Sequence, residues 1–308
     1  MYVLNASHII RTAWRTSPAM SETGQDIGIV YGFLRDFLLF LDLASREGEK
    51  IVVVFSEYPR DSRKIEPERF NRFFPRSERE LLQNYDIMRQ FLFSLFDNLP
   101  CYAINSKILS DYECARLLCA IHEAENADEP FTLFTPFDEY INFQNIVKNT
   151  VFHWFGDDMI PKTSLGFFRD ETGFDLRNSA IYYSFFGGKY TKRTVPFQKR
   201  TLLKQFPDLA TRQVCIDEVF SPTSQASVKI LSEVASNRDK IEAAFSFYVG
   251  RGNIKDSHLK NVGEYLKQKK KFNETKFVVS AYKLGLFKQM PGELELLTSH
   301  FRRISERL

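Results

Sequence analysis

The 308-residue chain contains few cysteines and no long uncharged apolar run. Its four cysteines form no Cys-x-x-Cys pair, and no histidine cluster accompanies them; they are Cys101, Cys114, Cys119 and Cys215. We therefore expect neither a disulfide framework nor a structural zinc site, and a reducing compartment fits this usage. No window of about 18 uncharged apolar residues occurs, and the first residues lack a basic-then-apolar leader. The sequence predicts a soluble protein of the cytoplasm.

Short motifs of several enzyme classes are also absent from the sequence. There is no Gly-x-Gly-x-x-Gly fingerprint, no phosphate-binding Gly-x-x-x-x-Gly-Lys-Ser/Thr loop, no Gly-x-Ser-x-Gly turn and no His-Glu-x-x-His motif. Cys114 and Cys119 fall in an apolar helical pattern, where buried thiols are usual, so they are not interpreted as nucleophiles. The five histidines show no ligand spacing and are interpreted as structural.

Charge is distributed unevenly along the chain. Residues 1–188 carry 19 Lys+Arg and 27 Asp+Glu, a net of −8, whereas residues 189–308 carry 23 and 12, a net of +11; the two parts sum to 42 and 39. The densest basic run, residues 189–204, holds six cations and no acid. Such a run is either a solvated helix face or a surface that follows nucleic-acid phosphates.

Hydrophobic periodicity predicts an α/β part followed by a helical part. Strands alternate with helices in the first part, with predicted elements at residues 2–4, 28–45, 51–55, 80–98, 100–106, 111–125 and 130–140. This alternation predicts a mostly parallel central sheet flanked by helices. VFHWF (151–155) and LGFF (165–168) are interpreted as edge strands, and the pattern is helical from residue 179. We predict an α/β domain over residues 1–185 and a basic helical domain over residues 186–308.

Acidic residues follow several predicted strands, at the edge of a parallel sheet where ligands bind. They are Asp111, Glu113 and Glu139, with Glu57 and Asp138 as neighbours. Divalent cations that assist phosphoryl chemistry require such oxygen ligands. Asp111 and Glu113 are about 200° apart around a helix, so they converge only if Asp111 lies at the helix cap.

Six stretches, in order over residues 1–210, resemble the 5′→3′ exonuclease and flap endonuclease superfamily in its bacterial and phage form. They are VLNASHIIRTAW, GIVYGFLRDFLLFL, IVVVFSEYPRDSRKIEPERFNRFF, SDYECARLLCAI, FTPFDEYINF and FGGKYTKRTVPFQKRTLLKQF. The resemblance implies the FEN-like, PIN-related α/β fold, an arch at about 56–79 and a helix-hairpin-helix-like region at about 186–210. It also implies a bacterial or phage-infected host cell and an Mg²⁺- or Mn²⁺-dependent nuclease ancestry.

By this resemblance, most of the metal-binding acids of the family are replaced. Other residues stand at acid positions, namely Asn5, Ser56, Cys114, Phe137, Gly188 and Thr191. Three carboxylates remain as candidate catalytic and metal-binding groups: Asp111, Glu113 and Glu139. Three carboxylates with lysines nearby would hold Mg²⁺ or Mn²⁺ only weakly.

The resemblance also implies two groups of DNA-binding cations. On the arch they are Arg60, Arg63, Lys64, Arg69 and Arg72, with Phe70, Phe73 and Phe74 able to stack on bases. In the later region they are Lys189, Lys192, Arg193, Lys199 and Arg200. The alternative for the arch is a solvated loop with Asp61, Glu66 and Glu68 as partners. The later region lacks the glycines of a helix-hairpin-helix, so contact there would rest on side chains. The KQKKK run ending at Lys271 is interpreted as a solvated helix end, with DNA contact as the alternative.

The sequence therefore favours a flap-endonuclease-like protein that binds branched, nicked or 5′-ended DNA in replication or repair and has lost two-metal catalysis. One alternative is an active, divergent 5′ nuclease that uses the three remaining carboxylates and recruited acids; these are Glu57, Asp138, Asp157 or Asp158. A second alternative is a protein–protein scaffold whose aromatic cleft is the working surface. Whether the chain is an enzyme stays open, with inactivity favoured.

Overall fold

The computed structural model describes most of the chain, in two compact units. The described residues are 1–6, 9–10, 13, 24, 26–44, 50–56, 78–106, 108–126, 128–146, 150–155, 161–163, 167–221, 228–250 and 254–307. Within them, the first unit comprises Met1–Leu118 and Ser257–Leu308, and the second comprises Cys119–Gly156 and Pro161–Asp256.

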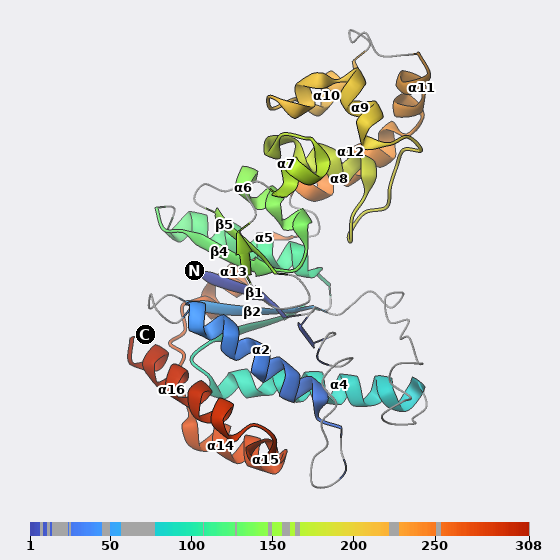
Figure 1. Ribbon diagram of the computed structural model, residues 1–308. Helices are drawn as coiled ribbons and strands as arrows, with labels where there is room; N and C mark the ends of the chain where they lie inside the picture. The colour runs from blue at the N-terminus through green and yellow to red at the C-terminus, as the bar shows by residue number, and fades with distance from the viewer. Residues whose placement is uncertain are drawn as a thin grey trace. The chain divides into compact units, whose positions relative to one another are not determined.

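Three parallel strands form the sheet of the first unit (Figure 1). They are β1 (Tyr2–Asn5), β2 (Ile51–Ser56) and β3 (Tyr102–Ser106), in the order β3-β2-β1. Tyr2 pairs with Ile51, and Val52 pairs with Tyr102. The side chains from Ile51 to Phe55 are at most 1% exposed, as expected for a central strand covered on both faces. The predicted central parallel strand at residues 51–55 is confirmed.

Helices pack against this sheet through a cluster of phenylalanine rings. The helices of the unit are α2 (Gly28–Ala44), α4 (Glu78–Leu95), η2 (Phe96–Asn98), the start of α5 (Asp111–Asn126), α13 (Asp256–Leu266), α14 (Glu274–Lys283), α15 (Leu286–Gln289) and α16 (Pro291–Arg307). Phe33 of α2 lies 5.9 Å from Phe55 of β2, ring centre to ring centre. Phe37 lies 5.7 Å from Phe96 and 6.3 Å from Phe301 of α16. These buried rings account for part of the high phenylalanine content.

The last helices therefore belong to the first unit. In Figure 1, α16 lies beside α2 and α15 lies beside α16, and Nε2 of the buried His300 is 2.8 Å from Oδ1 of Asp42. The boundary predicted near residue 185 divides the chain differently, because periodicity and charge do not reveal which sheet a C-terminal helix covers. The domain ranges 1–185 and 186–308 stay a prediction.

The second unit contains the remaining strands and the central run of helices. Strand β4 (Phe131–Thr135) is parallel to β5 (Thr150–Phe155), and β6 (Pro161–Thr163) is antiparallel to β5. The helices are η3 (Asp138–Asn142), α6 (Phe143–Ile146), α7 (Phe167–Thr172), η4 (Leu176–Asn178), α8 (Ser179–Phe186), α9 (Lys199–Gln205), η5 (Pro207–Ala210), α10 (Ile216–Phe220), α11 (Val228–Ser236) and α12 (Arg238–Val249).

The predicted fold class is confirmed: the strands are mostly parallel and are flanked by helices, with a long helical C-terminal part. Two details differ. VFHWF forms β5, which pairs on both sides and is not an edge strand, and Phe167 and Phe168 of LGFF begin helix α7. Most of the predicted arch, residues 57–77, lies outside the part of the chain that the structure describes. None of the described helices is long and apolar enough to cross a membrane.

Candidate functional site

A hydrogen bond between two buried polar side chains marks the carboxyl end of β1. Nδ2 of Asn5 donates to Oδ2 of Asp111 over 3.1 Å. Asn5 is 2% exposed and Asp111 is 3% exposed. Asn5 ends β1, and Asp111 is the first residue of α5, so parallel strand and helix meet at the sheet edge that the sequence predicts for a ligand site. The amide offers the carboxylate a partial positive charge in this water-excluded position.

Glu113 belongs to the cap of the same helix. Its Oε2 accepts hydrogen bonds from the backbone nitrogen and from Oγ of Ser110, both over 2.9 Å. Oγ of Ser110 accepts in turn from the backbone nitrogen of Glu113 over 3.2 Å. This reciprocal pair is a capping box, which satisfies otherwise unpaired N–H groups at a helix start. The cap residue is therefore Ser110, and not Asp111 as the converging-carboxylate hypothesis required.

Cys114 follows Glu113 and is completely buried. Its Sγ is 3.9 Å from the carbonyl oxygen of Leu109. Burial, together with the negative charges of Asp111 and Glu113, raises the pKa of this thiol to about 12, against a hydrogen bond with Ser106 that lowers it. A neutral buried thiol offers no oxygen ligand to a hard divalent cation.

These side chains do not fit a divalent metal ion. In the part of the chain that the structure describes, no group of three or more His, Cys, Asp or Glu side chains is arranged to hold one. The Asp111 carboxylate accepts the Asn5 amide, and the Glu113 carboxylate closes the capping box. Within the described residues, a cation at either carboxylate would meet a group that already accepts these hydrogen bonds, and no third acid, histidine or cysteine completes a metal-binding group.

In the second unit, Glu139 is buried against a glycine loop. It is 2% exposed, and its Oε1 accepts a hydrogen bond from the backbone nitrogen of Lys189. Burial raises the pKa of this carboxyl to about 7, helped by the charge of Asp138, while the bonds with Lys189 lower it. A Cβ atom at Gly188 would come within 2.7 Å of Cδ of Glu139. The carboxyl group of Glu139 therefore occupies the space that a side chain at Gly188 would take.

The ammonium group of Lys189 lies above the aromatic ring of Phe137. Nζ of Lys189 is 3.5 Å from the ring centre of Phe137 and 5.1 Å from that of Tyr190. The hydroxyls of Tyr140 and Tyr190 are 2.9 Å apart, and the ring of Tyr190 packs 5.9 Å from that of Phe247. A lysine ammonium over an aromatic face is a favourable cation–π contact. Phe137, Tyr140, Tyr190 and Phe247 thus form an aromatic group with Lys189 above it.

The predicted cations of residues 189–200 differ in how they are used. Arg193 donates to the carbonyl oxygens of Val195 and Phe197, and Lys199 donates to the carbonyl oxygen of Glu171. Lys192 and Arg200 are exposed, and within the described residues neither has an ion-pair partner. Arg193 and Lys199 therefore help to hold the local backbone, while Lys192 and Arg200 are the cations available to an anion from solution.

The other predicted contacts lie outside the described residues. They are Glu57, Arg60, Arg63, Lys64, Arg69, Phe70, Arg72, Phe73, Phe74, Asp157 and Asp158. Their predicted roles stay predictions. Of the three remaining carboxylates, Asp111 and Glu113 are in the first unit and Glu139 is in the second.

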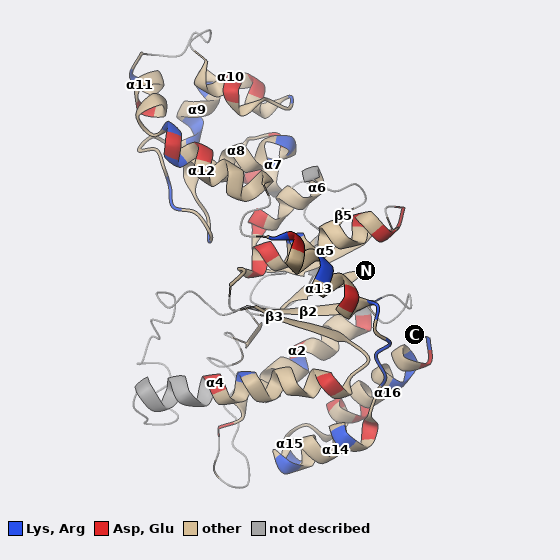
Figure 2. Cartoon of the chain, turned by 180° about the vertical axis from the view of Figure 1, so that it is seen from behind, with Lys and Arg blue, Asp and Glu red and all other residues tan. Residues whose placement is uncertain are grey.

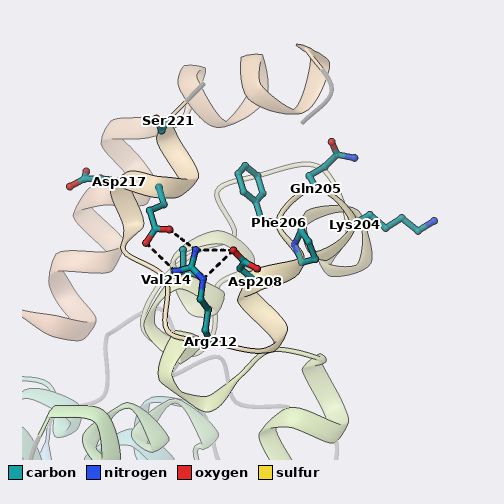
Figure 3. Close-up of a pocket in the computed structure, with 10 residues that line it drawn as sticks. Lys204, Gln205, Phe206, Asp208, Arg212, Val214, Asp217 and Ser221 are labelled. Carbon is teal, nitrogen blue, oxygen red and sulfur yellow. Dashed lines mark hydrogen bonds and ion pairs between the residues drawn. The ribbon is translucent and has the colours of Figure 1, made fainter. Parts of the chain in front are cut away.

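A groove of about 700 Å³ beside α9 and α10 is a separate feature (Figure 3). Arg212 lies within it, 2.8 Å from Oδ2 of Asp208 and 2.7 Å from Oε2 of Glu218. Asp217 and Lys204 also line the groove. Three acids against two cations make this groove a poor phosphate site, so we do not include it in the candidate DNA surface.

The residues that sequence reasoning missed are the partners of the remaining acids. Ser110 could have been found, because Ser-x-x-Glu before an apolar helix is the pattern of a capping box. The Asn5–Asp111 bond joins residues 106 positions apart, and no local pattern reveals it. The contact of Lys189 with Phe137 is long-range in the same way.

The chain has the fold of the FEN-like, PIN-related nuclease superfamily. Among solved structures, the bacteriophage T5 D15 protein co-crystallised with metal ions matches with a TM-score of 0.57 and 8% identity, over 86% of this chain and 97% of that chain. T5 5′-exonuclease with bound zinc matches with a TM-score of 0.56 and 9% identity, over 86% and 97%. A pseudo-enzyme form of the T5 D15 flap endonuclease, in complex with product DNA and metal ions, matches with a TM-score of 0.55 and 9% identity, over 87% and 100%.

At these identities the likeness describes the fold. No protein-family model matches the sequence, and no curated protein matches it. The predicted resemblance to the superfamily is thus confirmed through the three-dimensional fold.

Proposed function

We propose that this chain is a flap-endonuclease-like protein that binds branched or 5′-ended DNA and does not carry out two-metal cleavage. The observation that carries the proposal is the hydrogen bond between Asn5 and Asp111. In a two-metal nuclease, cations neutralise neighbouring carboxylates and stabilise charge on the scissile phosphate. Here the Asn5 amide contacts the carboxylate that a cation would need, and Glu113 is engaged at the helix start.

The fold and the charge distribution support the DNA-binding part of the proposal. The similar T5 flap endonuclease has been crystallised with DNA, and the net charge of residues 189–308 is +11. Lys192 and Arg200 are exposed cations in the region where the family contacts duplex phosphates. Figure 2 shows the basic stretch that precedes α9. Binding through such side chains does not require a divalent ion.

Equilibrium binding to a fluorescent 5′-flap duplex, measured in EDTA over a range of salt, tests this proposal. We expect affinity to fall steeply with salt, because each phosphate contact contributes about 0.9 to the slope of log K against log salt. Replacing Lys192 and Arg200 by Ala should lower this slope by about 1.8, which corresponds to a loss of about 60-fold near 0.1 M salt if affinities converge at 1 M.

The matched control replaces the exposed Lys229 and Lys240 of the same unit by Ala and removes the same charge. We expect this control to bind nearly as tightly as the unmodified chain. Absence of binding, or binding that does not depend on salt, would refute the proposed function.

A second candidate, an active divergent nuclease, is favoured by one observation. Asp111, Glu113 and Glu139 remain carboxylates at positions of at most 4% exposure, and carboxylate oxygens are the ligands that Mg²⁺ and Mn²⁺ require. A cleavage assay on 5′-flap and gapped DNA with Mg²⁺ or Mn²⁺ separates the candidates. Turnover that Glu113→Ala abolishes would establish this second function.

A further inference from the structure

The connection between α13 and α14 is strongly basic. Lys267, Lys269, Lys270 and Lys271 fall within five residues, and no acid lies between Lys267 and Asn273. Figure 2 shows this connection as a largely blue stretch leading from α13 toward α14. We call residues 267–271 the lysine loop. It belongs to the first unit, whereas the basic run that contains Lys192 and Arg200 belongs to the second.

Tyrosines anchor the start of the lysine loop to the edge strand of the sheet. The hydroxyl of Tyr102 in β3 donates to the carbonyl oxygen of Gln268 over 2.7 Å. The hydroxyl of Tyr265 accepts from the backbone nitrogen of Ala103 over 3.2 Å. The two tyrosine rings meet edge to face, 5.6 Å between centres. β3 is the outermost strand in the order β3-β2-β1, so these contacts tie the loop to an otherwise open strand edge.

The residues directly after the loop form a second anchor. Phe272 packs 5.4 Å from Phe301 and 5.9 Å from Phe277, ring centre to ring centre. Its backbone nitrogen donates to Oγ of Ser305 over 3.1 Å. The backbone nitrogen of Asn273 donates to the carbonyl oxygen of Asn98 over 2.8 Å. Lys269, Lys270 and Lys271 thus lie between two fixed points only four residues apart.

Two of the three lysines between the anchors present their charge to solvent. Lys269 and Lys271 are exposed, and Nζ of Lys270 lies 5.1 Å from the ring centre of Tyr265. In the described part of the chain, none of the three forms an ion pair with an acid. A fixed backbone lowers the entropy lost when these side chains meet a ligand.

We propose that the lysine loop binds the phosphate backbone of duplex DNA, as a second contact surface on the first unit. This inference rests on the proposed DNA-binding function and adds a surface to it. Lysine ammonium groups bind phosphates as point charges, without reading bases, so this contact is independent of sequence. The alternative interpretation of the KQKKK run as a solvated helix end predicts no effect on binding.

The test compares two double variants of the full chain in EDTA with a blunt DNA duplex. The test variant combines Lys269→Ala with Lys271→Ala and leaves Lys270 on Tyr265. The control combines Lys276→Ala with Lys283→Ala, two exposed lysines of α14 in the same unit. Both variants remove two positive charges. Unfolding by urea, monitored for each variant, establishes that both are folded before binding is compared.

We expect the test variant to lose about 1.8 from the slope of log K against log salt, and about 60-fold in affinity near 0.1 M salt, by the counterion arithmetic for two phosphate contacts. The control should change affinity less than about threefold, through long-range charge alone. Equal binding by the two variants would overturn the lysine-loop proposal while leaving the proposed function intact. If the unmodified chain does not bind DNA at all, the proposed function fails, and this inference fails with it.

Discussion

Replacing Asn5 with Asp tests whether the Asn5 amide performs the electrostatic role of a cation beside Asp111. The substitution removes a hydrogen bond to a charged acceptor, which contributes about 1.5–3 kcal/mol. It also places a second carboxylate about 3.1 Å from the first. At an effective dielectric constant of about 20, two charges at this distance repel by about 5 kcal/mol. The repulsion is an upper limit because one carboxyl of the pair can take up a proton.

We therefore expect Asn5→Asp to lower the free energy of unfolding by about 3–5 kcal/mol at about pH 8 without divalent ions. The carboxyl pair would bind its shared proton more tightly in the folded chain than in the unfolded chain. Its folded pKa is then raised, so stability is present at low pH and is lost as the pH rises through that pKa. The deficit should shrink as the pH falls toward about 5.

Urea unfolding followed by circular dichroism measures this effect at both pH values, with EDTA or Mn²⁺ present. Asn5→Ala is the control, because it loses the hydrogen bond without adding a charge and should show no such pH dependence. Mn²⁺ should restore stability to Asn5→Asp and not to Asn5→Ala, since only the first variant offers two carboxylates for an ion to bridge. An Asn5→Asp protein as stable as the unmodified chain at about pH 8 in EDTA would refute the reasoning.

Three further outcomes follow from the same contacts. Burial raises the pKa of Glu139 to about 7, so folding favours its protonated form. The free energy of unfolding should therefore fall by about 2.5 kcal/mol as the pH rises from about 5 to 8. Glu139→Gln should remove this dependence in urea unfolding, and an unchanged pH profile would contradict it. Gly188→Ala should destabilise the chain by about 1–3 kcal/mol because its Cβ meets Glu139. Gly263→Ala in helix α13 has nothing within 4 Å of the added Cβ, so it should be neutral or stabilise the chain by about 0.5–1 kcal/mol. Thermal unfolding compares the two variants, and equal losses of stability would contradict this prediction. Glu113→Ala should lower the free energy of unfolding by about 1 kcal/mol through loss of the capping box, and Glu113→Gln should lower it less. Urea unfolding measures both variants, and a larger loss of stability for Glu113→Gln would argue against a capping role.

The sequence allowed the order and type of most elements to be predicted, because their signals are local. The apolar β-branched run at residues 51–55 indicated a central parallel strand, and β2 is one. Helical spacing indicated a helix over residues 28–45 in the same way, and α2 covers Gly28–Ala44. VFHWF was predicted as an edge strand because the pattern of elements becomes irregular after about residue 145. Only the short β6, which pairs with it from a later part of the chain, makes β5 internal.

The candidate site was predictable in its residue types and not in its contacts. The resemblance identified Asn5 and Phe137 as replacements of acids, which indicated a weakened metal site. That Asn5 would bond Asp111, and that Lys189 would lie over Phe137, depends on side chains 106 and 52 positions apart. Such contacts arise from tertiary packing and leave no periodic signal. The Ser110 cap is the exception, because a capping box is a local pattern.

The measurement that tests the central claim most directly is a titration of the unmodified protein with Mn²⁺, followed by the electron paramagnetic resonance signal of the free ion. Because the Asn5 amide contacts Asp111 and Glu113 is held in a helix cap, we expect no tight stoichiometric binding of Mn²⁺. The signal of the free ion should then rise with added Mn²⁺ as it does in buffer alone. One or two Mn²⁺ ions bound per chain at micromolar concentration, lost in the Asp111→Asn variant, would contradict the account.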